Sequence, residues 1–342
     1  MEKLAESTTL LYSQLQQQCA TVLPIDKGIS YSKKKVSGKT YWYSELAVGG
    51  EKKEKSLGVD CEELRSQIEE RRALVEQAKD EVKSRQQLVG MLLKGGAASP
   101  TGTEARVLEV LEGAGVFLAG GVLVGSHAFS VYGNMLGVKW PTQIMKTQDM
   151  DVAGTQRIPV AAKRTDKTIG EALQETGMVF FEVPALHPKT PSTAYKIRGQ
   201  EFSVDLITPM FGATSSRPVY LKNLKTFAEP LRFLDYLLED TIPAVVVAKA
   251  GILVNVPNPS RFALHKLVVS VRRLANEHNK AVKDRMQAQL LLDVLLDERP
   301  WEVELAFQAA KNMSNKFSTQ LRQGIMLLDN KYKTPLLEML DE

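Results

Sequence analysis

The spacing of hydrophobic and polar residues differs between successive segments of the N-terminal third of the chain. Residues 1 to about 20 predict one short helix. The β-forming segment "KTYWYSEL", the turn signal "VGGEKK" and the segment "EKSLGV" predict two paired strands. From Cys61 to Lys94 the chain has no proline, and its apolar residues follow alternating steps of four and three. That is a heptad pattern, with Arg71 and Arg85 filling two seam positions between Leu64, Ile68, Val75, Ala78, Val82, Val89 and Leu92.

The heptad pattern predicts a helix about 50 Å long, at about 1.5 Å per residue. Such a helix is too long to be buried by a small sheet alone. We expect it to pack as a coiled coil, either on a partner chain, giving a homo-oligomer through residues 62–94, or on the protein's own helices. The segment "GGAASPTG", residues 95–102, ends the pattern and indicates a linker at a domain boundary.

After the linker, segments whose residue spacing predicts helices are interspersed with segments that predict strands. The segment "TEARVLEVLEGAG" predicts a helix capped by Thr103, residues 148–152 a strand, and residues 166–176 a short helix. Hairpins are predicted for "STAYKIR" with "EFSVDLI" and for "AVVVAK" with "ILVNV", and helices for the chain beyond Pro259. We therefore expect an α+β protein with a mixed-sheet core, an N-terminal small β-sheet plus long helix, and a C-terminal helical domain. The expected domains are residues 1–96, 97–257 and 258–342.

Composition adds few constraints. With 342 residues, 44% hydrophobic and 25% charged, the chain has the composition of a globular protein. A net charge of +4 does not by itself indicate a nucleic-acid-binding protein. Cys19 and Cys61 have no metal-ligand spacing and imply no disulfide framework. No apolar run reaches the length of a membrane span, and the first residues include acids and glutamines, so we expect no membrane partner and a cytoplasmic location.

The N-terminal β segments combine basic and aromatic residues. Tyr41, Trp42 and Tyr43 are surrounded by Lys33, Lys34, Lys35, Lys39, Lys52, Lys53 and Lys55. Such a surface can hold a nucleic-acid backbone and stack on its bases. It is equally typical of a small sheet whose edge strands carry solvated lysines.

Two predicted strands present carboxylates on one face. In "QDMDV", Asp149 and Asp151 point away from Met150 and Val152. In "EFSVDLI", Asp205 lies opposite the apolar face formed by Phe202, Val204 and Leu206. If these strands are neighbours, three carboxylates converge, an arrangement suited to Mg²⁺ or Mn²⁺. Two such ions can activate a hydroxyl and stabilise the leaving oxygen in phosphoryl or nucleotidyl transfer.

Gly125 and Ser126 precede the first acidic strand and begin a predicted helix. Glycine permits close backbone approach, and a helix N-terminus offers unpaired N–H groups to a triphosphate. A simpler interpretation is that the pair only turns the chain and caps the helix.

Together, these motifs resemble the nucleotidyltransferase fold shared by DNA polymerase beta and the antibiotic adenylyltransferases. The chain is more similar to a bacterial family of nucleotidyltransferase-like proteins related to the abortive-infection and type IV toxin–antitoxin transferases. The similarity covers roughly Thr103 to Leu296 and is carried by "VGSHAFSVYGNMLGV", "TQDMDV", "FSVDLITP", "PSRFALHKLVVS" and "KDRMQAQLL". The gap between Ser126 and Asp149 is longer than in the general superfamily, which looks like a trait of this family.

The resemblance implies a role for each matching residue. Asp149, Asp151 and Asp205 would be catalytic and would hold the metal ions, with Asp205 as base toward the acceptor hydroxyl. Gly125, Ser126, Lys266, Lys283 and Asp284 would bind the nucleotide. Without the resemblance, helical spacing alone puts Lys266 and Arg273 on one helix face, from which both could reach phosphates. Lys283 and Asp284 could then be ordinary surface charge. The four histidines, His127, His187, His265 and His278, have no mutual metal-ligand spacing and are interpreted as structural.

Three functions are compatible with these patterns. The first is a metal-dependent nucleotidyltransferase that moves NMP from an NTP such as ATP to a hydroxyl of tRNA, other RNA or protein and releases pyrophosphate. The resemblance adds a toxin-like role and an antitoxin-like partner to this hypothesis. The alternative is a non-catalytic nucleic-acid-binding protein that retains the transferase fold, and a third is a phosphohydrolase with the same two-metal chemistry.

Overall fold

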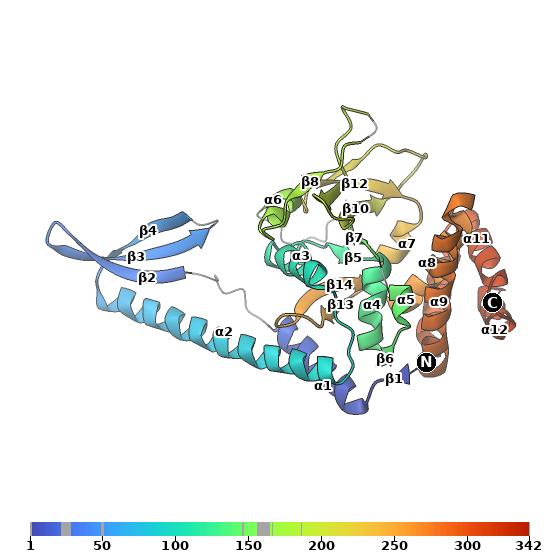
Figure 1. The fold of residues 1–342 in the computed structure, drawn as a ribbon, viewed down its shortest axis with the longest axis horizontal. Coiled ribbons are helices and arrows are strands. Elements are labelled where there is room, and N and C mark those ends of the chain that lie inside the picture. The colour runs from blue at the N-terminus through green and yellow to red at the C-terminus, as the bar shows by residue number, and fades with distance from the viewer. Residues whose placement is uncertain are drawn as a thin grey trace.

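An extended arm and a larger rounded body make up the computed structural model of the chain (Figure 1). The structure describes residues 2–21, 29–48, 51–145, 147–155, 165, 167–185 and 187–341. The arm consists of three antiparallel strands and one long helix. The strands are β2 (Ile29–Val36), β3 (Lys39–Val48) and β4 (Glu51–Val59), and the helix is α2 (Glu62–Lys94). The predicted pair of strands is present as β3 and β4, and β2 is an additional strand that was not predicted. Residues 49–50 of the predicted turn lie outside the described residues.

Contacts between the arm's sheet and α2 cover the aromatic residue at the centre of β3. Trp42 is buried, its Nε1 donates to Asp60 Oδ1 at 2.9 Å, and Lys33 lies 4.6 Å from the ring centroid. Arg72 of α2 lies 5.5 Å from the same ring and donates to the Tyr31 carbonyl at 3.1 Å. Trp42 therefore contributes to the contact between the sheet and the helix, and nucleic-acid binding by the arm remains a prediction.

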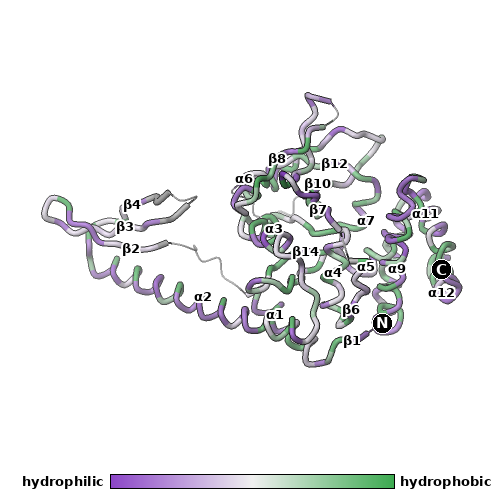
Figure 2. Tube along the Cα trace, viewed as in Figure 1, coloured by the Kyte–Doolittle hydropathy of each residue, from purple (hydrophilic) through white to green (hydrophobic). Residues whose placement is uncertain are grey.

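Helix α2 has the length that its heptad pattern predicts, and its buried residues gather mainly at its C-terminal end. Leu88, Val89 and Leu92 pack in one cluster with Tyr12 and Leu15 of α1 (Glu6–Ala20) and with Val245 and Val247. Arg85, an expected seam position, is buried and donates from Nε to the Ala250 carbonyl at 3.2 Å. The helix thus packs on one of the protein's own helices, and hydrophilic residues are frequent along its length (Figure 2). Oligomerisation through residues 62–94 remains a prediction.

Residues 95–101 are bound to the body and do not form a loose linker. Ala97 is buried, and the Asn134 side chain accepts from the Ala98 amide and donates to the Ala98 carbonyl, both at 2.8 Å. The following helix, α3 (Gly102–Gly113), is capped by Thr101 and not by the predicted Thr103. Thr101 accepts from the Glu104 amide while Glu104 accepts from the Thr101 amide, so both N-terminal amides are satisfied.

A seven-stranded mixed sheet forms the core of the body. Its order is β11-β12-β10-β7-β5, with β9 pairing β10 and β8 pairing β9. β10 is parallel to β7 and β12, and the remaining pairs are antiparallel. The strands are β5 (Val122–Leu123), β7 (Asp149–Ala153), β8 (Phe180–Glu182), β9 (Ala194–Ile197), β10 (Ser203–Pro209), β11 (Val219–Leu221) and β12 (Thr226–Leu231). Both predicted hairpins are present, as β9 with β10 and as β13 (Thr241–Val246) with β14 (Ile252–Pro257).

Helices cover this sheet and complete the chain, in agreement with the expected α+β class (Figure 1). The shorter elements are β1 (Glu2–Lys3), α4 (Gly125–Met135), β6 (Val138–Lys139), α5 (Thr142–Met145), α6 (Ile169–Gln174) and α7 (Leu234–Leu238). The C-terminal helices are α8 (Pro259–Arg272), a 3₁₀ turn (Ala275–Glu277), α9 (His278–Glu298), α10 (Pro300–Lys311), α11 (Asn315–Met326) and α12 (Asn330–Asp341). Among the helices of the described ranges, none has the length and apolar content needed to cross a membrane.

Candidate active site

Strands β7 and β10 bring the predicted acidic residues together at the centre of the sheet. The two strands are parallel neighbours, with Asp151 in register with Asp205 and Asp149 in register with Ser203. The alternating residues Met150 and Val204 are fully buried on the opposite face, as the sequence pattern predicts. Ser203 Oγ donates to Asp149 Oδ1 at 3.1 Å. The three carboxylates therefore share one face across two adjacent strands.

Burial and neighbouring negative charge raise the pKa of Asp151 and of Asp205. Burial is the main cause that raises the pKa of Asp205 to about 6, and the charges of Asp151 and Asp149 add to it. Burial also raises the pKa of Asp151, against the opposing effect of Lys266. Acids that are buried side by side are unfavourable as anions unless a cation neutralises them. A bound cation would therefore stabilise the ionised forms of Asp151 and Asp205.

Asp151 and Asp205 fit a divalent cation through their oxygen chemistry. Across the described ranges, no group of three or more His, Cys, Asp or Glu side chains already has the spacing to enclose one ion. Mg²⁺ does not require such an enclosure, because proteins often hold it by one or two carboxylates together with substrate phosphates. The adjacent acids of β7 and β10 supply that number of ligands.

Gly125 lies directly against this acidic pair. It starts α4 with φ of +64°, and a Cβ atom built on it would lie 2.2 Å from Asp151 Oδ2. Only glycine permits this approach, because it has no Cβ and adopts positive φ readily. Next to it, Ser126 Oγ accepts a long hydrogen bond, 3.4 Å, from Gln287 Nε2 of α9. The N-terminal end of α4 and the carboxylates therefore face the same small region.

A buried ion network connects α8 and α9 beside the acids. Asp284 accepts from Lys266 Nζ at 2.6 Å and from Arg273 Nε at 3.0 Å. Burial acts to raise the pKa of Asp284, but Lys266 and Arg273 outweigh it and hold the pKa below its usual value. Asp284 is only 3% exposed, so the interpretation of this residue as ordinary surface charge is wrong. It contacts Lys266 of α8 and Arg273, the residue that follows α8.

Lys283 is half-buried at the start of α9. Burial and the charge of Lys266 lower its pKa, while the charges of Asp149 and Asp151 oppose this effect. A contact of Lys283 with nucleotide remains a prediction. Gln287, one turn further along, is fully buried and contacts Ser126. Gln287 was not among the predicted site residues, although its spacing from Asp284 puts both on one helix face.

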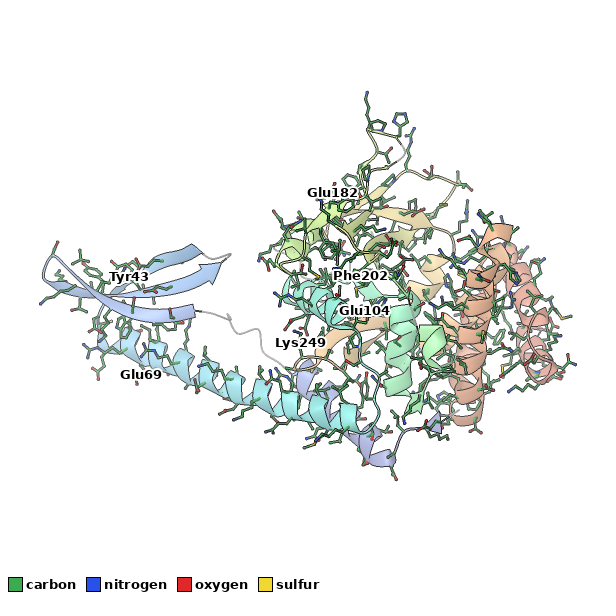
Figure 3. The ribbon with its side chains drawn as sticks, viewed as in Figure 1. Tyr43, Glu69, Glu104, Glu182, Phe202 and Lys249 are labelled. Atoms are coloured by element: carbon green, nitrogen blue, oxygen red, sulfur yellow. The ribbon has the colours of Figure 1, made fainter. Side chains whose placement is uncertain are left out.

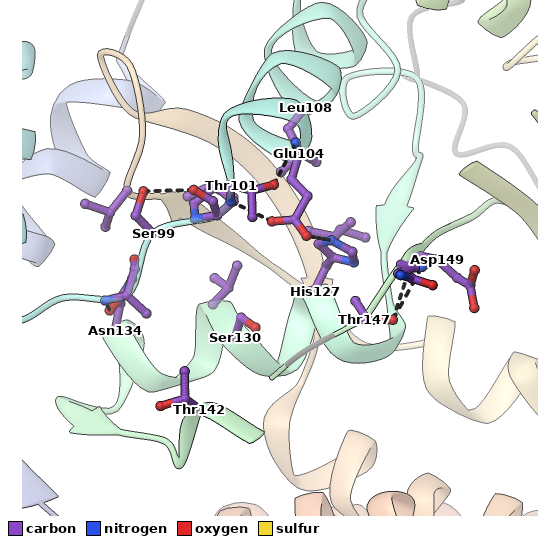
Figure 4. A pocket seen from close by; sticks show the side chains of 17 residues that line it. Ser99, Thr101, Glu104, Leu108, His127, Ser130, Asn134, Thr142, Thr147 and Asp149 are labelled. Carbon is purple, nitrogen blue, oxygen red and sulfur yellow. Dashed lines mark hydrogen bonds and ion pairs between the residues drawn. The ribbon is translucent and has the colours of Figure 1, made fainter. Parts of the chain in front are cut away.

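A cavity of about 750 Å³ opens beside Asp149, on the side of α4 that faces α3 (Figure 4). Glu104 of α3 and His127 of α4 provide charged or titratable groups in its lining. Glu104 was not among the predicted site residues, and His127 was predicted to be structural. The only sequence signal was the position of His127 immediately after Gly125 and Ser126.

The arm's sheet is remote from this region. Tyr43 lies on the sheet, whereas Glu104 lies in the body (Figure 3). Lys34 forms an ion pair with Glu54 and lies 5.2 Å from the Tyr43 ring centroid, and Lys33 contacts Asp60 at 3.2 Å. These lysines are exposed, which is compatible with a solvated rim and with a nucleic-acid contact.

Comparison with known proteins gives a direct assignment for the body of the molecule. Neither the curated proteins nor the solved structures contain a match to this chain. A family model described as nucleotidyltransferase matches residues 103–312, which is more than half of the 342 residues. The matched range includes both acidic strands, Gly125, Ser126 and the ion network of α8 and α9. The chain therefore belongs to the nucleotidyltransferase family and is a transferase of phosphorus-containing groups.

Proposed function

We propose that the protein transfers NMP from an NTP to a hydroxyl group in a metal-dependent reaction that releases pyrophosphate. The observation that carries this proposal is the register of Asp151 with Asp205, with the Gly125 backbone packed against Asp151. This arrangement places a carboxylate pair, which can bind divalent cations, beside a helix N-terminus, which can bind phosphate oxygens.

Each of the chain's groups has a definable task in this proposal. Asp151 and Asp205, with Asp149 on the same face, would hold Mg²⁺ or Mn²⁺, and the bound ions would neutralise the phosphates and polarise the reacting oxygens. Asp205 accepts the proton of the acceptor hydroxyl. The amides after Gly125 and the hydroxyl of Ser126 bind triphosphate oxygens, with Lys266 and Lys283 on the α8 and α9 side. Asp284 acts indirectly, by keeping Lys266 in place.

The decisive test is nucleotide transfer by an isosteric variant. Asp205→Asn keeps the shape of the side chain and removes its charge. We expect it to lower transfer of label from an α-labelled NTP by at least about 100-fold, the scale of general acid–base catalysis. Asp235→Asn, which changes an acid of α7 outside the acidic strands, is the matched control and should transfer at the parent rate. Equal transfer by Asp205→Asn and the parent would refute the mechanism.

RNA or protein is the proposed acceptor, and the arm is its proposed binding surface. The support is the exposed lysines of β2 together with the distance of the arm from the body, which leaves the sheet accessible (Figure 3). Nucleic-acid binding through lysines weakens steeply with salt. Transfer assays with total RNA and with cell lysate protein separate the two acceptor classes. RNA binding that is salt-sensitive, independent of Mg²⁺ and accompanied by no transfer would instead favour the non-catalytic alternative.

We further propose that the protein has a toxin-like role in the cell and an antitoxin-like partner. Its support is the resemblance of the acidic-strand and α8–α9 motifs to toxin-like transferases. Induced expression should arrest growth for the parent and not for Asp205→Asn. Growth unaffected by either protein, while purified parent transfers nucleotide, would exclude the toxic role and leave the enzymatic proposal standing.

A further inference from the structure

The cavity beside Asp149 has walls that suit a flat ring system. It is lined by the apolar residues Leu108, Leu123, Val131, Val246 and Val247, which come from α3, β5, α4 and the end of β13. Its volume of about 750 Å³ lies within the range of small-molecule sites, about 300–1,000 Å³. Apolar walls of this size can cover both faces of a nucleobase.

The charged groups of the cavity exclude phosphate as the bound group. No lysine or arginine is among the described residues that line it, and its carboxylates are Glu104 and Asp149. A phosphate would be repelled by these acids without a compensating cation. The basic groups Lys266 and Lys283 belong to α8 and α9, outside the lining. The cavity therefore suits an uncharged group that donates hydrogen bonds.

His127 supplies the second observation that points to a ligand. It is 7% exposed, and its Nδ1 atom has no hydrogen-bond partner in the described structure. Its Nε2 atom lies 3.4 Å from Glu104 Oε1, a long contact that leaves that nitrogen poorly satisfied (Figure 4). A buried polar group without a partner is unfavourable, so the imidazole is suited to a ligand that supplies one.

We propose that this cavity binds the base and sugar of a nucleoside whose base carries an exocyclic amino group. The amino N–H donates to Glu104, a ring nitrogen pairs with His127, and the base faces pack between Val131 and Val246. The sugar hydroxyls then point toward Asp149, at the end of the cavity nearest the acidic strands. This inference rests on the proposed function, because the nucleoside belongs either to the incoming NTP or to the acceptor.

Nucleoside binding to the full chain tests the proposal without any transfer step. Adenosine, guanosine, cytidine and uridine are titrated calorimetrically in the absence of divalent metal. We expect the three amino-bearing nucleosides to bind more tightly than uridine. Glu104→Gln should weaken their binding by about tenfold, the effect of losing one charge-assisted hydrogen bond. Glu109→Gln, on the same helix but outside the cavity, is the matched control and should bind as the parent does.

A second variant guards against a folding defect in Glu104→Gln. Val131→Trp fills the cavity, whereas Leu118→Trp places the same ring at a position that is 60% exposed. We expect only Val131→Trp to abolish nucleoside binding. Absence of binding by all four nucleosides at millimolar concentration, or equal binding by Glu104→Gln and Glu109→Gln, would overturn the proposal.

Titration in the presence of a saturating NTP distinguishes the two sources of the nucleoside. Competition assigns the cavity to the NTP's own nucleoside, and simultaneous binding assigns it to the acceptor. The Asp205→Asn variant separates this inference from the proposed function, since it should bind nucleosides normally. Nucleoside binding without transfer in the parent would reject only the proposed function, and transfer without nucleoside binding would reject only this inference.

Discussion

Replacing Gly125 by alanine perturbs the candidate active site at its tightest contact. The new Cβ would lie 2.2 Å from Asp151 Oδ2, whereas ordinary contacts begin at 3.4 Å. The carboxylate or the turn must therefore shift by about 1 Å, and a displacement of this size at a reacting centre can cost about 100-fold in rate. The φ of +64° adds strain, because a non-glycine residue in this conformation costs about 1–3 kcal/mol.

The expected result combines both effects. Gly125→Ala should lower the free energy of unfolding by about 1–3 kcal/mol and NMP transfer by about 100-fold. Urea denaturation measures the first quantity, and transfer from an α-labelled NTP well below the denaturation midpoint measures the second. Gly102→Ala is the control, since Gly102 opens α3 without a positive φ and nothing lies within 4 Å of its Cβ position. A Gly125→Ala protein that transfers nucleotide at the parent rate would show that the close approach to Asp151 has no catalytic consequence.

Two further predictions concern α8 and α9. Burial, with Lys266 and Arg272 nearby, lowers the pKa of His265 to about 3 despite the opposing charge of Asp284. The unfolded chain, with an ordinary pKa of about 6.5, binds the proton first as pH falls, so stability is lost below about pH 6.5. Between pH 8 and pH 5 this loss amounts to about 2 kcal/mol, and urea denaturation at both pH values should show a smaller loss for His265→Gln. Asp284→Asn should cost about 3–5 kcal/mol, because it leaves two partly buried cations without their carboxylate. The more exposed pair of Asp293 with Lys331 should cost at most about 1 kcal/mol when Asp293 becomes asparagine, and similar denaturation midpoints for the two variants would contradict the assigned importance of Asp284.

The acidic face of the sheet could be predicted from sequence because strand alternation is a local property. Met150 and Val204 mark the buried side, and Asp149, Asp151 and Asp205 follow from them by parity. The pairing of β7 with β10 is not local, and no sequence pattern specified that Asp151 rather than Asp149 stands opposite Asp205.

The lining residues that the sequence does not predict depend on tertiary contacts. Gln287 and Glu104 acquire a role only because α9 and α3 pack beside α4. The burial of Trp42 could not be predicted either, because aromatic content alone does not show that α2 covers one face of the sheet. The cap at Thr101 was missed by two residues, an ordinary uncertainty for helix ends.

The Asn134 side chain, which holds Ala98 through two hydrogen bonds, gives the molecule a mechanical coupling. Asn134 belongs to the same short helix that Gly125 begins, and Ala98 follows α2, a rod about 50 Å long. A tilt of about 5° at the anchored end of such a rod moves its far tip by about 4 Å. A force applied to the sheet would therefore act with leverage on α4, next to the carboxylates.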